Sequence, residues 1–326
     1  MKASVLMSIY NETEEEIHAS VNSVLGQSFD DFELIIVHDN PGSEDKKDIV
    51  SWLKNLDPRI IVIENETNIG LAMSMNKAFD FACGEYIIRM DSDDICEPGR
   101  FLREIELLET HKWDLVFSNY TMIDSNGDLL KNGKPAIPPK NKNESLLSEI
   151  IFDGIIHHPT IAMTRDIFIK AGEYRNFPCS QDLDLWLRMI ECGCRFLYIN
   201  DSFLKYRIRT NSISGSKRLN QHLTVIYIIR LFEERIKKGS DDYSEGHYNQ
   251  FIKSRITDRS KKRFEKALNY LKNALYTNNK LLKLLFQAKA FCLSEPLRYS
   301  YIYKKTHEDW FKKKLEQAQK GKVTII

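Results

Sequence analysis

The segment RMDSDD, residues 89–94, places three carboxylates directly after an apolar run. Asp91, Asp93 and Asp94 lie within four positions, where ionised side chains repel one another. An exposed turn or the N-cap of a helix would explain aspartates here without any function. A divalent cation bound between them would also explain them, because its charge cancels the repulsion.

Asp91 and Asp93 have the spacing of a shared ligand site. Alternate residues of an extended chain point to the same side, so the two carboxylates can converge while Ser92 faces elsewhere. Mg²⁺ and Mn²⁺ bind one or two carboxylates and complete their coordination with water and phosphate oxygens. The same D-x-D pattern occurs in haloacid-dehalogenase-type phosphatases, which usually carry Thr or Val where this chain has Ile95.

A second candidate for chemistry is Asp182, in the segment SQDLDLWLRMIECG (residues 180–193). Helical spacing predicts a buried stripe made of Leu183, Trp186, Leu187 and Ile190. Asp184 and Arg188 are four residues apart, and a surface ion pair suffices to explain them. Asp182 lies in the first turn, where a helix N-terminus favours the ionised carboxylate and would keep it available as a base. A plain helix cap is the alternative.

The elements that must position these residues alternate between strands and helices. Strands are predicted at Ser4–Ile9, Glu33–Val37, Ile60–Ile63, Tyr86–Met90 and Leu115–Ser118. Helices are predicted at Thr13–Leu25, Lys46–Leu56, Leu71–Ala82 and Gly99–His111. Thr13 and Glu16 have the spacing of a capping box, which supports the first helix start. This order predicts an α/β fold with a mainly parallel sheet covered on both faces.

Polar residues follow three of the predicted strands, at 10–12, 38–40 and 91–93. Ligands of such sheets bind beyond the carboxyl ends of the strands. We therefore expect one shared site rather than three separate turns.

The composition indicates two regions. The chain has 326 residues, of which 42% are hydrophobic, enough for a full core. Residues 216–326 contain 25 Lys and Arg against 11 Asp and Glu, whereas residues 1–215 contain 22 against 35. We therefore expect two regions with different partners, an acidic one at 1–215 and a basic helical one at 216–326.

The cellular location is predicted from what the sequence lacks. The N-terminal residues do not resemble a signal peptide, and apolar runs such as Val225–Ile229 are too short to span a membrane. Six scattered cysteines are expected to be free thiols. The prediction is a cytoplasmic protein, either free in the cytoplasm or peripheral on the inner face of the cell membrane.

The basic C-terminal region allows two interpretations. Its lysines and apolar residues, as in residues 266–291, suit docking on an anionic membrane surface. Alternatively, the apolar stripe forms a helical subdomain or a homodimer contact, and the basic face is only solvated. A nucleic-acid partner is not expected, because the region carries no recognisable binding module.

Taken together, several segments resemble the inverting glycosyltransferases of family 2, which have a GT-A-type nucleotide-binding domain. They occur in family order within residues 3–215: SVLMSIYNE (4–12), SVLGQSFDDFELIIVHDN (23–40), NIGLAMSMNKAF (68–79), GEYIIRMDSDD (84–94), HPTIAMTRDIFIKAGEY (158–174), QDLDLW (181–186) and YRIRTNSIS (206–214). The resemblance implies a GT-A fold followed by an all-α C-terminal region.

The resemblance also implies roles for individual residues. It places in the nucleotide-sugar pocket Ser8, Tyr10, Glu12, Asp39, Asn76, Asp91, Ser92, Arg207 and Arg209. Tyr10 would stack on the base, Asp39 would accept a hydrogen bond from uracil, and Asn76 lies on the helix that walls the pocket. Asp91 would contact the ribose side of the donor, and Asp93 would bind the metal, Mn²⁺ or Mg²⁺, that bridges the diphosphate.

The implied reaction is transfer of a sugar from a nucleotide sugar, most simply a UDP-sugar, to a hydroxyl of a glycan or lipid-linked glycan. Asp182 would remove the proton from that hydroxyl, and the metal would stabilise the departing diphosphate. The alternative is a catalytically silent nucleotide-sugar-binding or membrane scaffold protein. An intact D-x-D motif and Asp182 favour the enzyme, since a binding protein needs no base.

Two positions depart from the family pattern. Arg209 stands where many members have a His that helps to bind metal or diphosphate. Arginine does not ligate cations but pairs with phosphate oxygens, so Arg207 and Arg209 are expected to hold the diphosphate directly. Met75 stands where an Arg often precedes Asn76, which removes one donor contact.

His157 and His158 precede the PT segment, near the acceptor side of the family's site. We expect them to be either acceptor contacts or structural histidines. The proline- and lysine-rich segment Asn132–Asn143 is predicted to be a loop, either a lid over the acceptor or an exposed connection.

Overall fold

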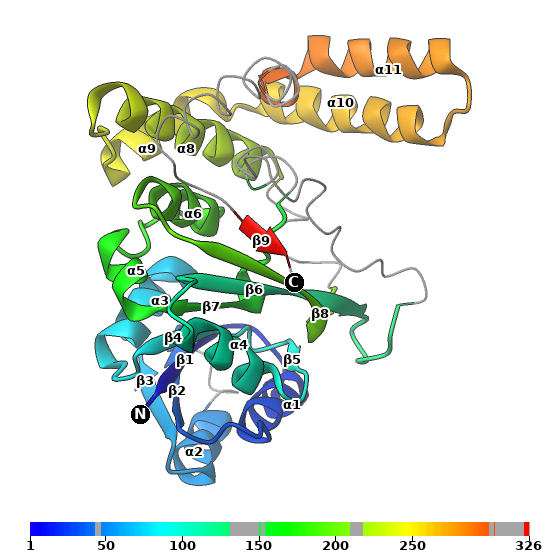
Figure 1. Ribbon diagram of the computed structural model, residues 1–326. Coiled ribbons are helices and arrows are strands. Elements are labelled where there is room, and N and C mark those ends of the chain that lie inside the picture. The colour runs from blue at the N-terminus through cyan, green and yellow to red at the C-terminus, as the bar shows by residue number, and fades with distance from the viewer. Residues whose placement is uncertain are drawn as a thin grey trace. The chain divides into compact units, whose positions relative to one another are not determined.

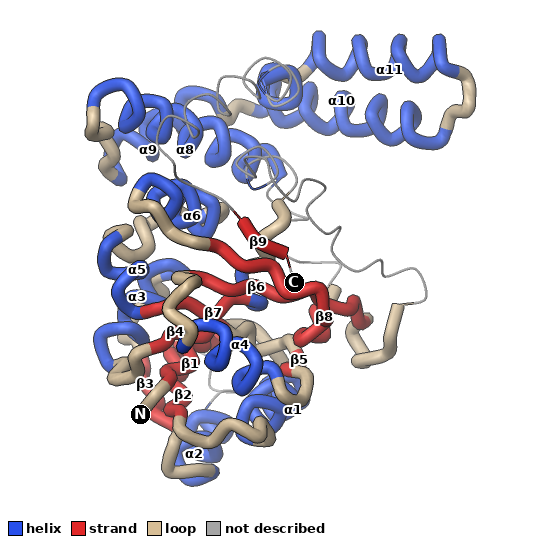
Figure 2. Tube along the Cα trace, viewed as in Figure 1, coloured by secondary structure: helices blue, strands red, loops and turns tan. Residues whose placement is uncertain are grey.

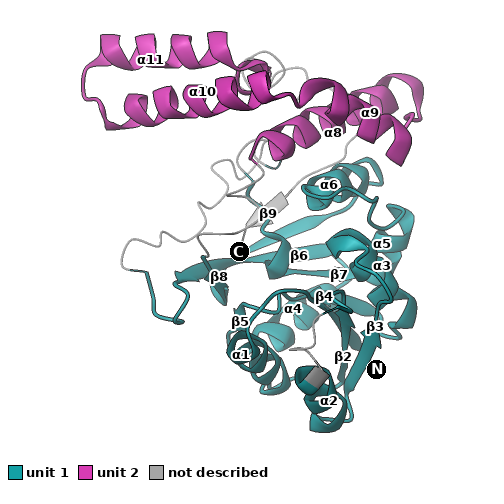
Figure 3. Ribbon diagram, turned by 180° about the vertical axis from the view of Figure 1, so that it is seen from behind, with its two compact units in different colours: residues 1–209, 312–326 teal, residues 210–311 magenta. Residues whose placement is uncertain are grey.

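The computed structural model describes residues 1–42, 47–130, 150, 154–208, 218–299, 303 and 323–325. The chain divides into two compact units, one formed by residues 1–209 with 312–326 and the other by residues 210–311 (Figure 3). The segment Asn132–Asn143 and Arg209 lie outside the described residues.

The first unit is built on one mixed sheet (Figures 1 and 2). Its strands follow the order β3-β2-β1-β4-β7-β6-β8-β5, and β9 pairs with β8. Their bounds are β1 (Ala3–Ile9), β2 (Phe32–His38), β3 (Ile60–Glu64), β4 (Tyr86–Arg89), β5 (Ile95–Cys96), β6 (Leu115–Ile123), β7 (Ile161–Thr164), β8 (Phe196–Arg207) and β9 (Val323–Ile325).

Strands β3, β2, β1 and β4 are parallel neighbours, as are β6 and β8, whereas β7 runs antiparallel to both β4 and β6. The expected mainly parallel mixed sheet is therefore confirmed. The helices of this unit are α1 (Glu14–Leu25), α2 (Lys47–Leu56), α3 (Gly70–Phe81), α4 (Arg100–Glu109), α5 (Arg165–Lys170) and α6 (Gln181–Glu191). A short 3-10 helix, η3 (His158–Thr160), leads into β7.

Three strands of the parallel half, β1, β2 and β4, are buried because helices cover the sheet, whereas the edge strand β3 is half-buried. Every residue of β2 and β4 is buried, and β1 is buried except at Ser8. Gly84 enters β4 so close to β1 that an added Cβ would lie 2.5 Å from the Ala3 carbonyl carbon. Only glycine fits there, which lets β4 pair with β1 and carry its C-terminal end to the site.

The predicted elements of the first half occur in the structure within a few residues of their predicted bounds. The capping box of α1 is present, with Thr13 accepting from the Glu16 N–H at 3.3 Å and Glu16 accepting from the Thr13 N–H at 2.8 Å. After β6 the chain turns at residues 125–127, where Gly127 has φ 89° and donates to the Asp124 carbonyl at 3.1 Å. The strand β9 was not predicted.

The second unit contains the helices α8 (Arg218–Lys238), α9 (Glu245–Arg255), α10 (Asp258–Tyr276) and α11 (Lys280–Leu293). The expected helical region is thus present. Across the described part of the chain, no helix combines the length and the apolar character that crossing a bilayer requires.

Candidate active site

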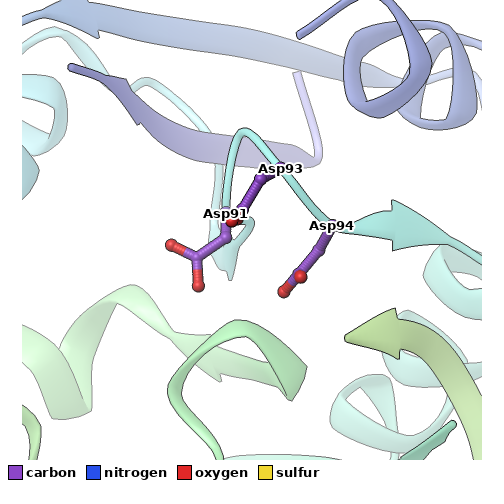
Figure 4. A group of neighbouring side chains, drawn as sticks. All are labelled: Asp91, Asp93 and Asp94. Carbon is purple, nitrogen blue, oxygen red and sulfur yellow. The ribbon is translucent and has the colours of Figure 1, made fainter. Parts of the chain in front are cut away.

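Three carboxylates meet at the turn that follows β4. Asp91, Asp93 and Asp94 lie on this single turn, and their side chains face a common space (Figure 4). One carboxylate oxygen from each lies within 4.8 Å of the others. An all-oxygen donor set of this size suits Mg²⁺ or Mn²⁺.

Asp94 is the most buried of the three. Its side chain is inaccessible to solvent, and its Oδ1 accepts a hydrogen bond from the Arg207 N–H at 2.8 Å. Its Oδ2 is buried and has no hydrogen-bond partner among the described residues. Burial raises the pKa of Asp94 well above its ordinary value, and the charges of Asp91 and Asp93 raise it further. A cation at this turn would satisfy the orphaned oxygen and remove the repulsion, so the residues present fit a divalent metal.

The carboxylate turn is tied to neighbouring elements by hydroxyl groups. Ser92 donates to the Ser8 carbonyl at 2.8 Å, and Ser20 of α1 donates to the Asp91 carbonyl at 2.9 Å. Ser92 therefore points away from the carboxylates, as predicted. The predicted reason was wrong, because β4 ends at Arg89 and residues 92–94 form a turn rather than an extended strand.

Arg89, the last residue of β4, lies behind the carboxylate turn. Its guanidinium forms an ion pair with Asp91, and its side chain is only 3% exposed. The Nε and Nη1 atoms of Arg89 are buried, and no group in the described part of the chain forms a hydrogen bond with them. The positive charge of Arg89 also acts on His158 and Asp182, lowering the pKa of each. Arg89 thus links the carboxylate turn to the candidate base.

Asp182 occupies the first turn of α6, and its Oδ1 accepts a hydrogen bond from the Leu183 N–H at 2.9 Å. Burial raises the pKa of Asp182 above its ordinary value, although the Leu183 N–H and Arg89 act in the opposite direction. The pKa of Asp182 is thus raised overall, whereas the helix N-terminus alone was expected to lower it. A raised pKa makes the carboxylate a stronger base once ionised.

The helix that carries Asp182 is anchored by a buried ion pair. The apolar stripe of α6 is buried as predicted. The pair of Asp184 and Arg188 also forms, with N–O distances of 2.8–2.9 Å, but Asp184 is fully buried, so the predicted surface location was wrong. Arg188 donates in addition to the carbonyls of Ala171 and Glu173. This fixes the start of α6 against the segment before it.

Asp39, after β2, closes the N-terminus of α3. Its carboxylate accepts hydrogen bonds from the N–H groups of Ile69 and Gly70 and from the Asn65 amide, each at 2.8 Å. The Asp39 side chain is buried. The predicted hydrogen bond from uracil remains a prediction, and the contacts observed are those of a helix cap.

Asn76 joins α3 to the segment before α6. Its amide nitrogen donates to the Tyr174 carbonyl at 2.8 Å, and its amide oxygen accepts from the Tyr174 N–H at 3.0 Å. Asn76 therefore positions the wall of the site, and its contact with the donor stays a prediction.

The segment after β1 carries an exposed aromatic ring. Tyr10 is 46% exposed, so one face can accept a stacked base. Its N–H donates to Glu12 at 2.7 Å, and its carbonyl accepts from the Asn40 amide at 3.1 Å. Glu12 thus shapes the turn that presents Tyr10, and Asn40 ties this turn to the end of β2.

Arg207, the last residue of β8, is buried against the carboxylate turn. Its Nε donates to the Asp93 carbonyl at 2.8 Å, and its Nη1 donates to the carbonyls of Asp124 and Ser125 at 3.0 Å. These contacts position the turn. The predicted contact with diphosphate is untested, and the same prediction for Arg209 falls outside the described residues.

The two histidines each bond to a tyrosine hydroxyl. Nε2 of His157 lies 2.8 Å from the Tyr120 hydroxyl, and Nε2 of His158 lies 2.6 Å from the Tyr174 hydroxyl. Burial lowers the pKa of His157 to about 4 and lowers that of His158 as well. Both rings are therefore neutral near pH 7. A structural role is visible for both, and an acceptor contact stays a prediction.

The sequence analysis assigned no role to Arg89 or Tyr174. It considered a cation between all three aspartates but named only Asp91 and Asp93 as metal ligands. A charged residue inside the buried run of residues 85–90 was a signal for Arg89, since isolated arginines are rarely fully buried. The third carboxylate of RMDSDD was visible, but only the folded turn brings it to the other two.

Comparison with known proteins agrees with this geometry. The family model described as glycosyl transferase family 2 matches residues 4–172. An uncharacterized glycosyltransferase of Methanocaldococcus jannaschii is 36% identical over 218 residues, which cover 66% of this chain and 74% of that protein. The UDP-Glc:alpha-D-GlcNAc-diphosphoundecaprenol beta-1,3-glucosyltransferase WfaP of Escherichia coli is 30% identical over 217 residues, covering 66% and 80%.

A solved structure shows the same fold. The chain resembles S. aureus TarS 1-349 in complex with UDP-GlcNAc, with a TM-score of 0.59 and 20% identity, over 98% of this chain and 92% of that one. A mixed sheet with acidic side chains beyond its parallel strands is the architecture of a GT-A-type glycosyltransferase. The chain belongs to glycosyl transferase family 2 and is a glycosyltransferase.

Proposed function

We propose that this glycosyltransferase moves a sugar from a UDP-sugar to a hydroxyl of a lipid-linked glycan, with inversion at the anomeric carbon, during synthesis of a bacterial surface polysaccharide. The observation that carries the proposal is the meeting of Asp91, Asp93 and Asp94 on one turn, with Arg89 paired to Asp91 and its charge also acting on Asp182 of α6. A donor-side acidic cluster and a separate candidate base are what a single-displacement transfer requires.

The choice of donor and acceptor rests on the E. coli relative. Its name gives a UDP-sugar donor and a diphosphoundecaprenol-linked acceptor. Exposed Tyr10 offers a stacking face for the base. A lipid-linked acceptor would bring the protein to a membrane surface, in keeping with the predicted peripheral location on the inner face of the cell membrane.

In the proposed reaction, ionised Asp182 accepts the proton of the acceptor hydroxyl. The acceptor oxygen forms a bond to the anomeric carbon while the bond from that carbon to the diphosphate oxygen breaks, and the leaving diphosphate takes the electron pair. Asp91, Asp93 and Asp94 would hold Mn²⁺ or Mg²⁺, which when bound supplies positive charge to the diphosphate. Arg89 keeps a positive charge beside Asp91 and Asp182.

The substitution Asp182→Asn tests the proposal, because it preserves shape while removing the base. Sugar transfer should fall by about 10²- to 10⁴-fold, which is the usual contribution of general base catalysis. UDP affinity, measured by calorimetry, should change little. The matched control is Asp201→Asn, at an exposed position of β8. Retained transfer by Asp182→Asn would remove this residue from its role, and loss of UDP binding would point to a structural defect.

A further inference from the structure

The α10–α11 hairpin ends in an exposed apolar surface. We call residues 272–285, where the two helices meet, the hairpin tip. The most exposed apolar residues here are Leu275 at 78%, Tyr276 at 79%, Leu281 at 77% and Leu284 at 64%, with Leu282 at 42% and Leu285 at 47%. Contiguous exposed leucines are unusual on a soluble surface and mark an interaction site.

The tip differs from the other end of the same hairpin. There, Phe264, Ala267, Ala290 and Leu297 are buried together and form a small core. The apolar residues of the hairpin thus differ in burial. Those at the base pack together, whereas at the tip Ala274 is buried and the leucines and Tyr276 named above stay exposed. The tip is also locally well defined, because Asn279 caps α11 by accepting from the N–H groups of Leu281 and Leu282 at 2.9 and 3.2 Å. The helix cap fixes which way these leucines point.

The charge around the tip is of one sign. Residues 266–294 contain five lysines and no Asp or Glu. Lys272, Lys280 and Lys283 are exposed and lie among the exposed leucines. Lysine side chains of this kind reach anionic headgroups while neighbouring leucines enter the boundary of the acyl chains.

The charge of the hairpin tip decides between two binding partners, a second copy of the chain and a lipid surface. A second copy would bring two lysine-rich tips together, and their like charges would oppose the contact. An anionic lipid surface attracts the lysines and accepts the leucines. We propose that the hairpin tip docks the protein on an anionic membrane, with Leu281 and Leu284 inserted and Lys280 and Lys283 against the headgroups.

This inference deepens the proposed function and rests on it, because a lipid-linked acceptor gives the protein a reason to bind a membrane. The two can fail separately. Vesicle binding is measured without nucleotide sugar, and UDP affinity is measured without vesicles. Vesicle binding without UDP binding would contradict the proposed function alone, and UDP binding without vesicle binding would contradict the docking surface alone.

The experiment is co-sedimentation of the full chain with phosphatidylcholine vesicles with and without phosphatidylglycerol. The wild-type chain should bind only the anionic vesicles, more weakly as salt rises. Leu281→Gln/Leu284→Gln should weaken binding by about tenfold or more, given the free energy of burying a leucine. The control Leu102→Gln/Leu129→Gln changes two exposed leucines of the first unit and should bind like the wild type.

The lysines are tested in the same assay. Lys280→Glu/Lys283→Glu should abolish most of the binding at low salt, whereas Lys261→Glu/Lys262→Glu, with the same charge change at the start of α10, should have a smaller effect. Equal effects of the two double variants, wild-type binding by the Leu281→Gln/Leu284→Gln variant, or no binding by the wild type at low salt would each overturn the proposal. A dimer in light scattering that only the leucine variant dissociates would assign the tip to a second copy instead.

Discussion

Arg89 and Asp91 form an ion pair whose members differ in burial, with the Arg89 side chain 3% exposed and that of Asp91 30% exposed. The positive charge thus lies beneath the site and the negative charge faces it. Arg89 also lowers the pKa of Asp182, on a different element. The Arg89 guanidinium therefore interacts with both Asp91, which the proposed reaction assigns to the donor, and Asp182, which it assigns to the acceptor.

Replacing Arg89 should change the pH dependence of transfer. Without its charge, burial and the negative charge of Asp91 raise the pKa of Asp182, opposed by the N–H groups of Leu183 and of Asp182 itself. The acidic limb of kcat/KM for Arg89→Met should move to higher pH, and a limb that moves by about one pH unit lowers the rate on its acidic side about tenfold. Arg89→Lys, which keeps the charge, should restore part of the profile. If the acidic limb of Arg89→Met stays at the wild-type pH, Arg89 does not affect the pKa of Asp182.

Asp94 should make the metal-free protein less stable as pH rises. Its folded-state pKa lies above the ordinary value of 3.8, so the stabilisation present below that pH is lost as the pH rises toward the folded-state pKa. In EDTA, the wild-type Tm should therefore fall relative to that of Asp94→Asn as the pH rises above the ordinary aspartate pKa of 3.8. Adding Mn²⁺ should raise the wild-type Tm more than that of the variant. Parallel Tm curves in EDTA would show that Asp94 is not perturbed.

The Asn76 contacts should stabilise the first unit. Asn76→Ala removes both hydrogen bonds to Tyr174 and leaves two backbone groups without their partner, which costs about 2–4 kcal/mol of unfolding free energy. Urea unfolding measures this loss. Asn22→Ala, at an exposed position of α1, is the control and should cost less than about 0.5 kcal/mol. Equal losses in the two variants would argue against the contact.

Local patterns were sufficient for the first half of the fold. The capping box of Thr13 and Glu16, the apolar strands and the helical stripe of α6 depend on neighbouring residues, and the structure confirms them. The rule that ligands bind beyond parallel strands also identified the region of the carboxylate turn. These features could be predicted because spacing along the chain determines them.

Long-range pairing could not be read from the sequence. The hydrogen bonds of Asn76 with Tyr174 and of Arg207 with the carboxylate turn join residues about a hundred positions apart. The burial of Asp184 depends on packing of α6 that no local pattern encodes. For the same reason, β9, which pairs with β8, was missed.

The most direct test of the account is UDP binding by calorimetry with Mn²⁺ and with EDTA, in the wild type and in Asp93→Asn. The account predicts that Mn²⁺ strengthens UDP binding to the wild type by about tenfold or more and that Asp93→Asn loses this gain. Asp128→Asn, an acidic residue in the turn after β6, should keep it. Equal UDP affinity with Mn²⁺ and with EDTA, or a full Mn²⁺ effect in Asp93→Asn, would contradict the assignment of the carboxylate turn to metal and diphosphate.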